Sequence, residues 1–329
     1  MSKTATAAGD SQLTLGLERS LPDYERAHCE TRVGARVYIG DCRDLVPTIP
    51  ECAAGAIDLI FADPPFNWAR DYDRHGVGDA WEDSMPDDAY CDPADSLLPA
   101  GQAHSFTMQW LDACIGALSP TGSMWVNIPD DWAAEIVLHL KRRGLFMVNW
   151  CIWHYRFGQN TKGKFISSKA HVLYFCKDPA RRVWRADEIL EVSDRRSIYF
   201  DPRTESKKDG MPAGMRVPMD VWYGQYWGRI QGNNKERRHG HDNQLPEVYL
   251  ERVIRASSEP GMLVMDPFLG SGTTGVMAHA LGRHFIGCEY SPTNARQAWE
   301  RIEAGPIRLG ALEGASTAIF PGRRTRREV

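Results

Sequence analysis

The chain has 329 residues, 43% of them hydrophobic and 25% charged, with a net charge of -4, which is an ordinary composition for a globular protein of one or two domains. No segment reaches the ~18 uninterrupted apolar residues of a membrane span, and Met1–Asp10 has no apolar run of the signal-peptide type. Eight cysteines are scattered singly without a C-x-x-C pair, which argues against a zinc ribbon and against a secreted disulfide framework. We therefore expect a reduced, soluble, cytoplasmic protein that holds no metal and does not enter a membrane.

Short apolar runs alternate along the chain with helical patterns. Residues 1–30 precede this alternation and lack periodicity, so we expect a flexible leader with at most one short helix. The expected strands are Val37–Ile39, Ile57–Phe61, Ser123–Asn127, Met147–Trp153, His171–Cys176, Met262–Met265 and His284–Gly287. The expected helices are Phe106–Leu118, Asp131–Arg142, Pro246–Ser257, Thr273–Leu281 and Thr293–Ile302. This order predicts an α/β fold with a doubly wound, mostly parallel sheet.

Two stretches interrupt the alternation and differ in charge. Residues 71–103 are acidic and rich in Asp, Pro and Gly, which predicts a long loop. Residues 178–240 mix Arg, Lys, Pro, Trp and Tyr without periodicity, which predicts an insert with a separate task. Residues 141–240 hold 21 Lys and Arg against 10 Asp and Glu, whereas residues 51–140 hold 16 acidic residues against two arginines. Such a basic segment indicates either a surface that faces a polyanion or a solvated, salt-bridged face.

A glycine-rich loop joins an expected strand to an expected helix. Gly270, Gly272 and Gly275 spell G-x-G-x-x-G there, and glycines let the backbone turn tightly and approach a ligand closely. Glu289 ends the next strand, where an acidic side chain accepts hydrogen bonds from ribose hydroxyls. No lysine precedes Thr273, which excludes a nucleotide-triphosphate P-loop. A nicotinamide cofactor also fits the loop, but a dehydrogenase needs more chain after Glu289 unless its order is permuted, and a plain glycine-rich turn is the alternative.

The sequence Asp63-Pro64-Pro65-Phe66 follows the apolar run Ile57–Phe61. Two prolines directly after a buried strand end it and stiffen the turn. Asp63 and the carbonyl of Pro64 can accept the two hydrogens of an amine, while Phe66 stacks on a planar ring. The alternative is a turn that ends the strand and carries an incidental Asp. Both loops are expected beyond the carboxyl ends of the strands, where ligands bind in open α/β sheets.

The order of these motifs resembles that of the DNA amino-methyltransferases of the β group, in which D-P-P-[YFW] precedes F-x-G-x-G. Here Asp63-Pro-Pro-Phe66 precedes Phe268-Leu-Gly-Ser-Gly272, and the resemblance covers about residues 34–303. It includes Gly40-Asp41 after a short strand, Gly122–Ile128 as the strand after the catalytic motif, and His241–Glu247 before the last helix–strand unit. The resemblance implies a seven-stranded, Rossmann-like methyltransferase fold of permuted order with a small recognition insert.

The resemblance also implies a site for S-adenosylmethionine. In it, Asp266 would face the amino-acid end of the cofactor, Glu289 the ribose and Asp41 the adenine amine, although Asp41 also suits a simple turn. The implied cofactor-binding residues are Asp41, Asn243, Gln244, Asp266, Phe268, Gly270, Gly272, Thr273 and Glu289. The implied catalytic residues are Asp63, Pro64, Pro65 and Phe66.

The implied reaction is direct in-line methylation of the N6 amine of adenine in a flipped-out base. A leading Asp is the family habit of adenine enzymes, whereas N4-cytosine enzymes more often have Ser-Pro-Pro. The chain has no Pro-Cys pair, which argues against the C5-cytosine mechanism. Methylation of N4-cytosine or of an RNA amine, and an idle DNA-binding scaffold, are the alternatives.

The expected partner is double-stranded DNA. The family places its recognition insert between a catalytic half and a cofactor-binding half, here residues 178–240 between residues 31–177 and 241–305, with residues 306–329 as a basic tail. The side chains expected to contact DNA are Arg156, Lys162, Lys164, Arg195, Arg196, Arg237 and Arg238. The sequence leaves open the recognition sequence, the oligomeric state (a homodimer included), the existence of an endonuclease partner and the role of residues 71–103.

Overall fold

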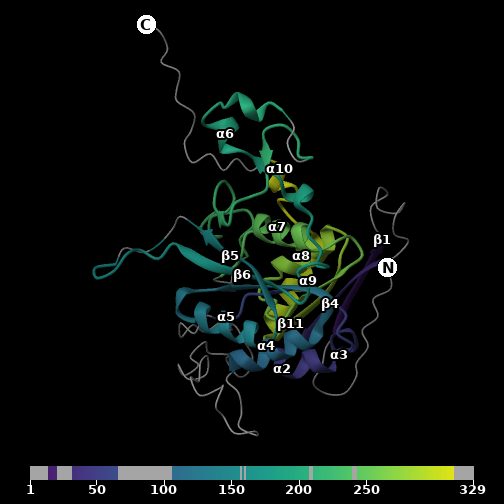
Figure 1. Cartoon of the computed structure of the whole chain (residues 1–329). Coiled ribbons are helices and arrows are strands. Elements are labelled where there is room, and N and C mark those ends of the chain that lie inside the picture. Colours follow the sequence, from purple (N-terminus) through teal and green to yellow (C-terminus); the bar gives the residue numbers. More distant parts are fainter. Residues whose placement is uncertain are drawn as a thin grey trace.

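A computed structural model (Figure 1) describes residues 14–20, 32–65, 106–155, 158, 161–206, 210–238 and 243–314 of the chain. Its main feature is one nine-stranded sheet with the order β1-β2-β11-β10-β3-β4-β6-β5-β9. The strands in that order are Thr14–Ser20, Arg32–Ile39, His284–Glu289, Leu263–Asp266, Ile57–Ala62, Leu118–Ile128, Lys169–Cys176, Phe146–His154 and Val221–Trp222. Five of the eight neighbouring pairs are parallel, and β1–β2, β4–β6 and β5–β6 are antiparallel.

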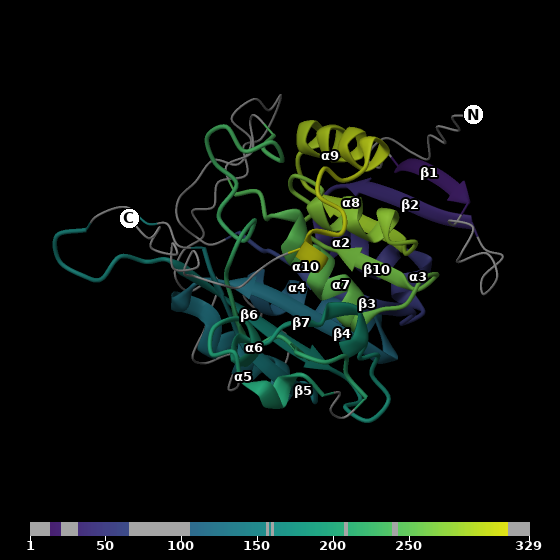
Figure 2. The same cartoon turned by 90° about the horizontal axis from the view of Figure 1, so that it is seen from above.

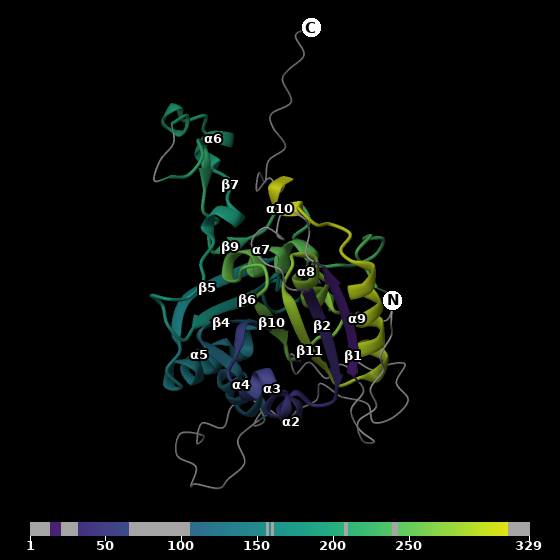
Figure 3. The ribbon, with the colours of Figure 1, turned by 90° about the vertical axis from the view of Figure 1, so that its right-hand side faces the viewer.

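Helices cover both faces of this sheet (Figures 1 and 3). On one face lie α2 (Cys42–Leu45), α3 (Pro50–Ala53), α4 (Phe106–Ala117) and α5 (Ala133–Arg142), and on the other α7 (Glu247–Ser257), α8 (Thr273–Ala280) and α9 (Pro292–Ala304). Strand β3 is buried on both sides, because Leu59 and Phe61 pack into one hydrophobic cluster while Ile60 and Ala62 pack into the other. Strands enclosed in this way read as continuous apolar runs, which is how the sequence presents β3.

The strands β3 and β10 are parallel neighbours, and the connections that follow them run to opposite sides of the sheet. Strand β3 leads through α4 to β4 on one side, and β10 leads through α8 to β11 on the other. The connections therefore leave a crevice beyond the carboxyl ends of β3 and β10, the position at which open α/β sheets bind ligands. The two predicted motifs follow these two strands directly.

The expected fold is confirmed, with two additions at the sheet edges. All seven expected strands and all five expected helices are present within a few residues of the expected bounds. The prediction of a flexible leader is wrong over Thr14–Ser20, because these residues form β1 and pair antiparallel with β2. The short strand β9 at the other edge comes from residues 178–240, so the expected insert is joined to the sheet through hydrogen bonds to β5.

The rest of the insert is irregular, as expected. It contains η4 (Ala186–Ile189), β7 (Glu191–Val192), α6 (Asp194–Ser197), η5 (Pro202–Thr204) and β8 (Met215–Arg216), and the part with α6 and β7 projects beyond the sheet (Figures 1 and 3). Two further short 3-10 helices are η1 (Val46–Thr48) and η3 (Asp130–Trp132). The acidic stretch 71–103 lies outside the described residues.

The chain stays ordered beyond the expected boundary at residue 305. The amides of Ile307 and Arg308 donate to the Glu247 carboxylate at 2.8 and 2.7 Å, and α10 (Ala311–Gly314) follows (Figure 2). Residues 306–314 therefore pack against α7, and the basic end of the expected tail lies outside the described residues. Within the described ranges no helix is long and apolar enough to cross a membrane, and the six cysteines are free and buried.

Gly272 connects the glycine-rich loop to α8 and has a backbone conformation that favours glycine. Its φ of +80° is left-handed, and it occupies the N-cap position of α8. A Cβ at this position would lie 2.9 Å from Cβ and 3.0 Å from Cα of Ala298 on α9. The second glycine of the motif thus permits close packing of the loop against α9.

We expect Gly272→Ala to lower the free energy of unfolding by about 1–3 kcal/mol, because it adds both left-handed strain and a clash with backbone. The matched control is Gly116→Ala in α4, where an added Cβ meets nothing within 4 Å and the stability should stay the same or rise slightly. Urea unfolding of the two variants measures the difference. Equal stability of both would contradict the packing role of Gly272.

Candidate active site

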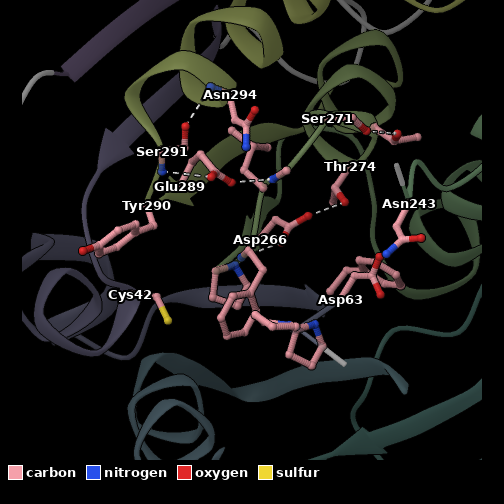
Figure 4. Close-up of a pocket in the computed structure, with 18 of the residues that line it drawn as sticks. Cys42, Asp63, Asn243, Asp266, Ser271, Thr274, Glu289, Tyr290, Ser291 and Asn294 are labelled. Carbon is pink, nitrogen blue, oxygen red and sulfur yellow. Dashed lines mark hydrogen bonds between the residues drawn. The ribbon is translucent and has the colours of Figure 1, made fainter. Parts of the chain in front are cut away.

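Two cavities meet at the carboxyl ends of β3 and β10. The large cavity encloses about 1010 Å³ including its opening, which is a common size for a ligand site, and the small cavity beside it about 480 Å³. Ten predicted site residues line the large cavity: Asp41, Asp63, Pro64, Pro65, Asn243, Asp266, Phe268, Gly270, Thr273 and Glu289 (Figure 4). The small cavity is lined by Asp63, Asn127, Pro129, Trp153, Tyr155, Lys169, Ala170, Arg229, Ile230, Asn243, Gln244 and Leu245. Asp63 lies between the two.

The carboxylate of Asp63 is held by a chain of two hydrogen bonds. Asn127, near the end of β4, donates from Nδ2 to Asp63 Oδ1 at 2.7 Å, and Tyr249 of α7 donates to Asn127 Oδ1 at 3.2 Å. Enclosure by protein raises the pKa of Asp63 to about 7, although the hydrogen bond from Asn127 acts in the opposite direction. The Asp63 side chain therefore has a fixed orientation, and it changes charge near neutral pH.

Asp266, at the end of β10, organises the glycine-rich loop. Its Oδ1 accepts from the Phe268 amide at 2.9 Å, and its Oδ2 accepts from the Thr274 hydroxyl at 2.6 Å. Burial raises the pKa of Asp266 to about 7. Because both oxygens already hold the loop, Asp266 shapes the cavity wall that it also lines.

Glu289, at the end of β11, closes the other side of the large cavity. Its carboxylate accepts from the Gly270 amide at 2.8 Å and from the Ser291 amide at 3.0 Å, as Figure 4 shows. Glu289 thus ties the glycine-rich loop to the start of α9. An acid in this place, at the strand end opposite a glycine-rich loop, suits ribose hydroxyls.

The amino end of α8 borders the large cavity through Ser271 and Thr273. Its N-cap is Gly272, which has no side chain to accept from the amides of the first turn. Helix amino termini of this kind favour anionic groups. The Thr273 hydroxyl donates to the Leu245 carbonyl at 3.2 Å and accepts from Arg301 at 2.7 Å. Its hydroxyl is therefore committed to the protein interior.

An apolar wall and several carboxylates complete the large cavity. The Phe268 ring lies 5.1 Å from that of Trp110 and 6.3 Å from that of Phe106. Asp41 also lines this side, where it caps α2 and pairs with Arg43 at 2.7 Å. With Asp63, Asp266 and Glu289, four carboxylates face a cavity with apolar walls, which suits a ligand that is both planar and positively charged.

Two predicted cofactor residues are placed differently. Gly272 does not line the large cavity and packs against α9 instead. Gln244 lines the small cavity and uses its amide on a neighbouring loop, accepting from the Arg238 amide at 2.9 Å and donating to the Glu236 carbonyl at 2.6 Å. Phe66 lies outside the described residues.

The residues predicted to contact DNA fall into three groups. Lys162 and Lys164 are exposed on the loop between β5 and β6, and Arg156 of that loop lies outside the described residues. Arg195 and Arg196 are exposed near α6, where Arg195 pairs with Asp201 and Arg196 donates to the Ala213 carbonyl. Arg237 and Arg238 are half-buried in the loop that precedes residue 239. Their contact with DNA stays a prediction.

The sequence analysis did not identify Asn127 and Tyr249 as site residues. Arg229 is not among the seven side chains that it expects to contact DNA. Arg229 lines the small cavity, donates to Asn243 at 3.2 Å and lies over the Tyr155 ring. The available signal for Asn127 was a polar residue at the end of a strand that is otherwise apolar. Nothing in the sequence pattern distinguished Tyr249 from other apolar-face residues of its helix.

Comparison with known proteins identifies the family. The N6/N4 methyltransferase family model, described as DNA methylase, matches residues 57–300. The chain is 30% identical to the type II methyltransferase M.BamHI of Bacillus amyloliquefaciens over 88% of its own length, but it spans only 62% of that relative. It is 29% identical to the type II methyltransferase M1.MboII of Moraxella bovis, over 74% of this chain and 88% of that protein.

Solved structures share the fold. The M1.HpyAVI–SAM complex matches with a TM-score of 0.53 at 17% identity, over 82% of this chain and 98% of that one. The PvuII DNA methyltransferase (cytosine-N4-specific) matches with a TM-score of 0.51 at 16% identity, over 85% of this chain and 90% of that one. The match of the family model over residues 57–300 shows that the chain belongs to the DNA methylase family, as the order of its motifs predicted. The cofactor is S-adenosylmethionine.

Proposed function

We propose that the protein transfers a methyl group from S-adenosylmethionine to the N6 amine of adenine in DNA. The observation that carries this proposal is the position of Asp63, a fixed carboxylate between a large cavity suited to the cofactor and a second, smaller cavity. The names of the relatives, all type II methyltransferases, support DNA as the substrate. Because a base in a duplex cannot reach a carboxylate that lines a cavity, the target nucleotide has to leave the stack.

The large cavity fits the cofactor in charge and shape. Glu289 would bind the ribose, the aromatic wall around Phe268 the adenine, and the amino end of α8 the carboxylate of the methionine part. When bound, the cofactor supplies a methyl group on a positively charged sulfur, which is already activated for transfer. The carboxylate of Asp266, which lines the same cavity, would stabilise that positive charge.

Asp63 would orient the amine for attack. The lone pair of an exocyclic amine is conjugated into the ring, so the amine is a poor nucleophile. Hydrogen bonds from the amine to the Asp63 carboxylate and the Pro64 carbonyl favour a more tetrahedral nitrogen with its lone pair directed into the large cavity. The nitrogen would gain the methyl group as its bond to sulfur breaks, and Asp63 would accept the proton that the nitrogen loses. Asn127 acts as a positioning residue for Asp63 in this scheme.

Adenine is the proposed base because the motif begins with Asp63. In the family that the sequence resembles, adenine enzymes usually have Asp at this position. The same two acceptors would also hold the N4 amine of cytosine, which is the alternative. An RNA amine would use the same chemistry in a different polymer.

The direct test is methyl transfer from labelled S-adenosylmethionine to unmethylated bacterial DNA, followed by nucleoside analysis. We expect label in N6-methyladenine. Label in N4-methylcytosine would keep the mechanism and refute the choice of base, and label only in RNA would refute DNA as the substrate. Cofactor binding without any methylated product would favour an idle scaffold.

We expect Asp63→Asn to reduce methyl transfer at least ~100-fold, because the amide cannot accept the proton of the amine. Its affinity for S-adenosylmethionine, measured by calorimetry, should change far less. Asp58→Asn is the matched control, since Asp58 lies on the same strand but accepts from the Leu263 amide away from both cavities. Normal turnover of Asp63→Asn would refute the catalytic role.

The rate of methyl transfer should fall as the pH decreases through the pKa of Asp63. The ionised carboxylate is the form that accepts from the amine, and burial raises its pKa to about 7 in the cofactor-free protein. A positively charged cofactor lowers this pKa, so the midpoint of the profile should lie at or below 7. Single-turnover rates between pH 5 and 9 measure it, and a flat profile would contradict an ionisable Asp63 in the reaction.

A further inference from the structure

The loop between β5 and β6, residues 155–168, rises from the wall of the small cavity. Tyr155 at its start and Lys169 just after its end both line that cavity. The two ends are joined by a hydrogen bond from the Tyr155 amide to the Ser168 carbonyl at 3.0 Å. Because β5 ends and β6 begins at the level of the β4 end, where His171 pairs with Ile128, the loop lies at the same edge of the sheet as Asp63 and Asn127. Figures 1 and 2 show the described part of the loop, residues 161–168, reaching outward beyond the sheet.

The second half of this loop exposes the phenyl ring of Phe165 to solvent. Phe165 is 99% exposed, the highest value among the exposed large apolar side chains of the described residues, and Ile166 beside it is 46% exposed. An exposed ring of this kind offers a face on which a nucleic-acid base can stack. The turn that presents Phe165 is ordered locally, because the Thr161 hydroxyl donates to the Lys164 carbonyl at 2.6 Å.

The surroundings of Phe165 are basic. Lys162 and Lys164 are exposed, and neither pairs with an acidic side chain within the described part of the chain. Two lysines around an exposed ring suit a partner that offers both phosphates and stacked bases. An apolar protein surface would leave the two charges without partners, so nucleic acid is the better match.

We propose that the Phe165 ring inserts into the DNA base stack beside the flipped nucleotide, with Lys162 and Lys164 on the adjacent phosphates. This role rests on the proposed function, because it concerns the same DNA substrate. Three residues of chain lie between Phe165 and the cavity residue Lys169, so the two Cα atoms are at most roughly 14 Å apart, which is the rise of about four base pairs. The ring therefore contacts DNA close to the target base, where it replaces stacking lost on flipping.

The test compares a paired target with one that is already unpaired. Methyl transfer is measured on a duplex with the mapped target base in a normal pair and on the same duplex with an abasic site opposite that base. We expect Phe165→Ala to lose roughly 5- to 150-fold in kcat/KM on the paired duplex, the value of one base–aromatic stack, and to recover most of it on the unpaired one. Phe165→Trp should keep the activity on both.

The matched control is Phe146→Ala, which removes a different phenyl ring, 52% exposed, at the opposite end of β5. It should match the wild type on both duplexes. Full activity of Phe165→Ala on the paired duplex would overturn the proposal, and so would an equal loss on both duplexes or a change of oligomeric state in sedimentation. Wild-type inactivity on both duplexes would instead refute the proposed function, and this role with it.

Discussion

The site depends on holding the half-buried Asp63 carboxylate between two cavities, at the point where the strands β3 and β10 pair in parallel and their connections run to opposite sides. A pKa near 7 instead of 3.8 corresponds to a cost on the order of 4 kcal/mol for the ionised form in the folded protein. The structure limits this cost through the hydrogen bond from Asn127, which Tyr249 orients in turn. The result is a carboxylate that is rigid, poorly solvated and close to its point of ionisation, and these properties favour a group that binds and deprotonates an amine.

A second buried network fixes the loop opposite Asp63. Arg301 of α9 pairs with Glu247 of α7 at 3.0 Å and donates to the Ser271 carbonyl at 3.1 Å. Burying an ion pair is costly and is tolerated when further hydrogen bonds satisfy both groups. Here Glu247 also accepts the amides of residues 307 and 308, so the loop, two helices and the segment after α9 are held by one cluster of charges. This explains why the chain remains ordered past the expected boundary.

The parts of the fold that follow from local patterns could be predicted. The apolar run of β3, the prolines after it and the glycines before α8 each encode their own conformation, and their order along the chain indicated the family. Contacts between distant segments could not be predicted. Asn127 reaches Asp63 from a neighbouring strand, and Gly272 faces α9 instead of the cavity, which depends on how the loop packs. The strand β1 was missed because its edge pairing with β2 leaves no clear periodicity in the sequence.

In the proposed function, Asp63 acts between a cavity that binds the cofactor and a cavity that binds the target base. The most direct measurement is a crystal structure of the protein with S-adenosylhomocysteine and a duplex that contains its target site. We predict the target base in the small cavity, with its amine within ~3 Å of the Asp63 carboxylate and the Pro64 carbonyl, and the cofactor product between Glu289 and the amino end of α8. A base bound with its amine away from Asp63, or a cofactor product outside the large cavity, would contradict the claim.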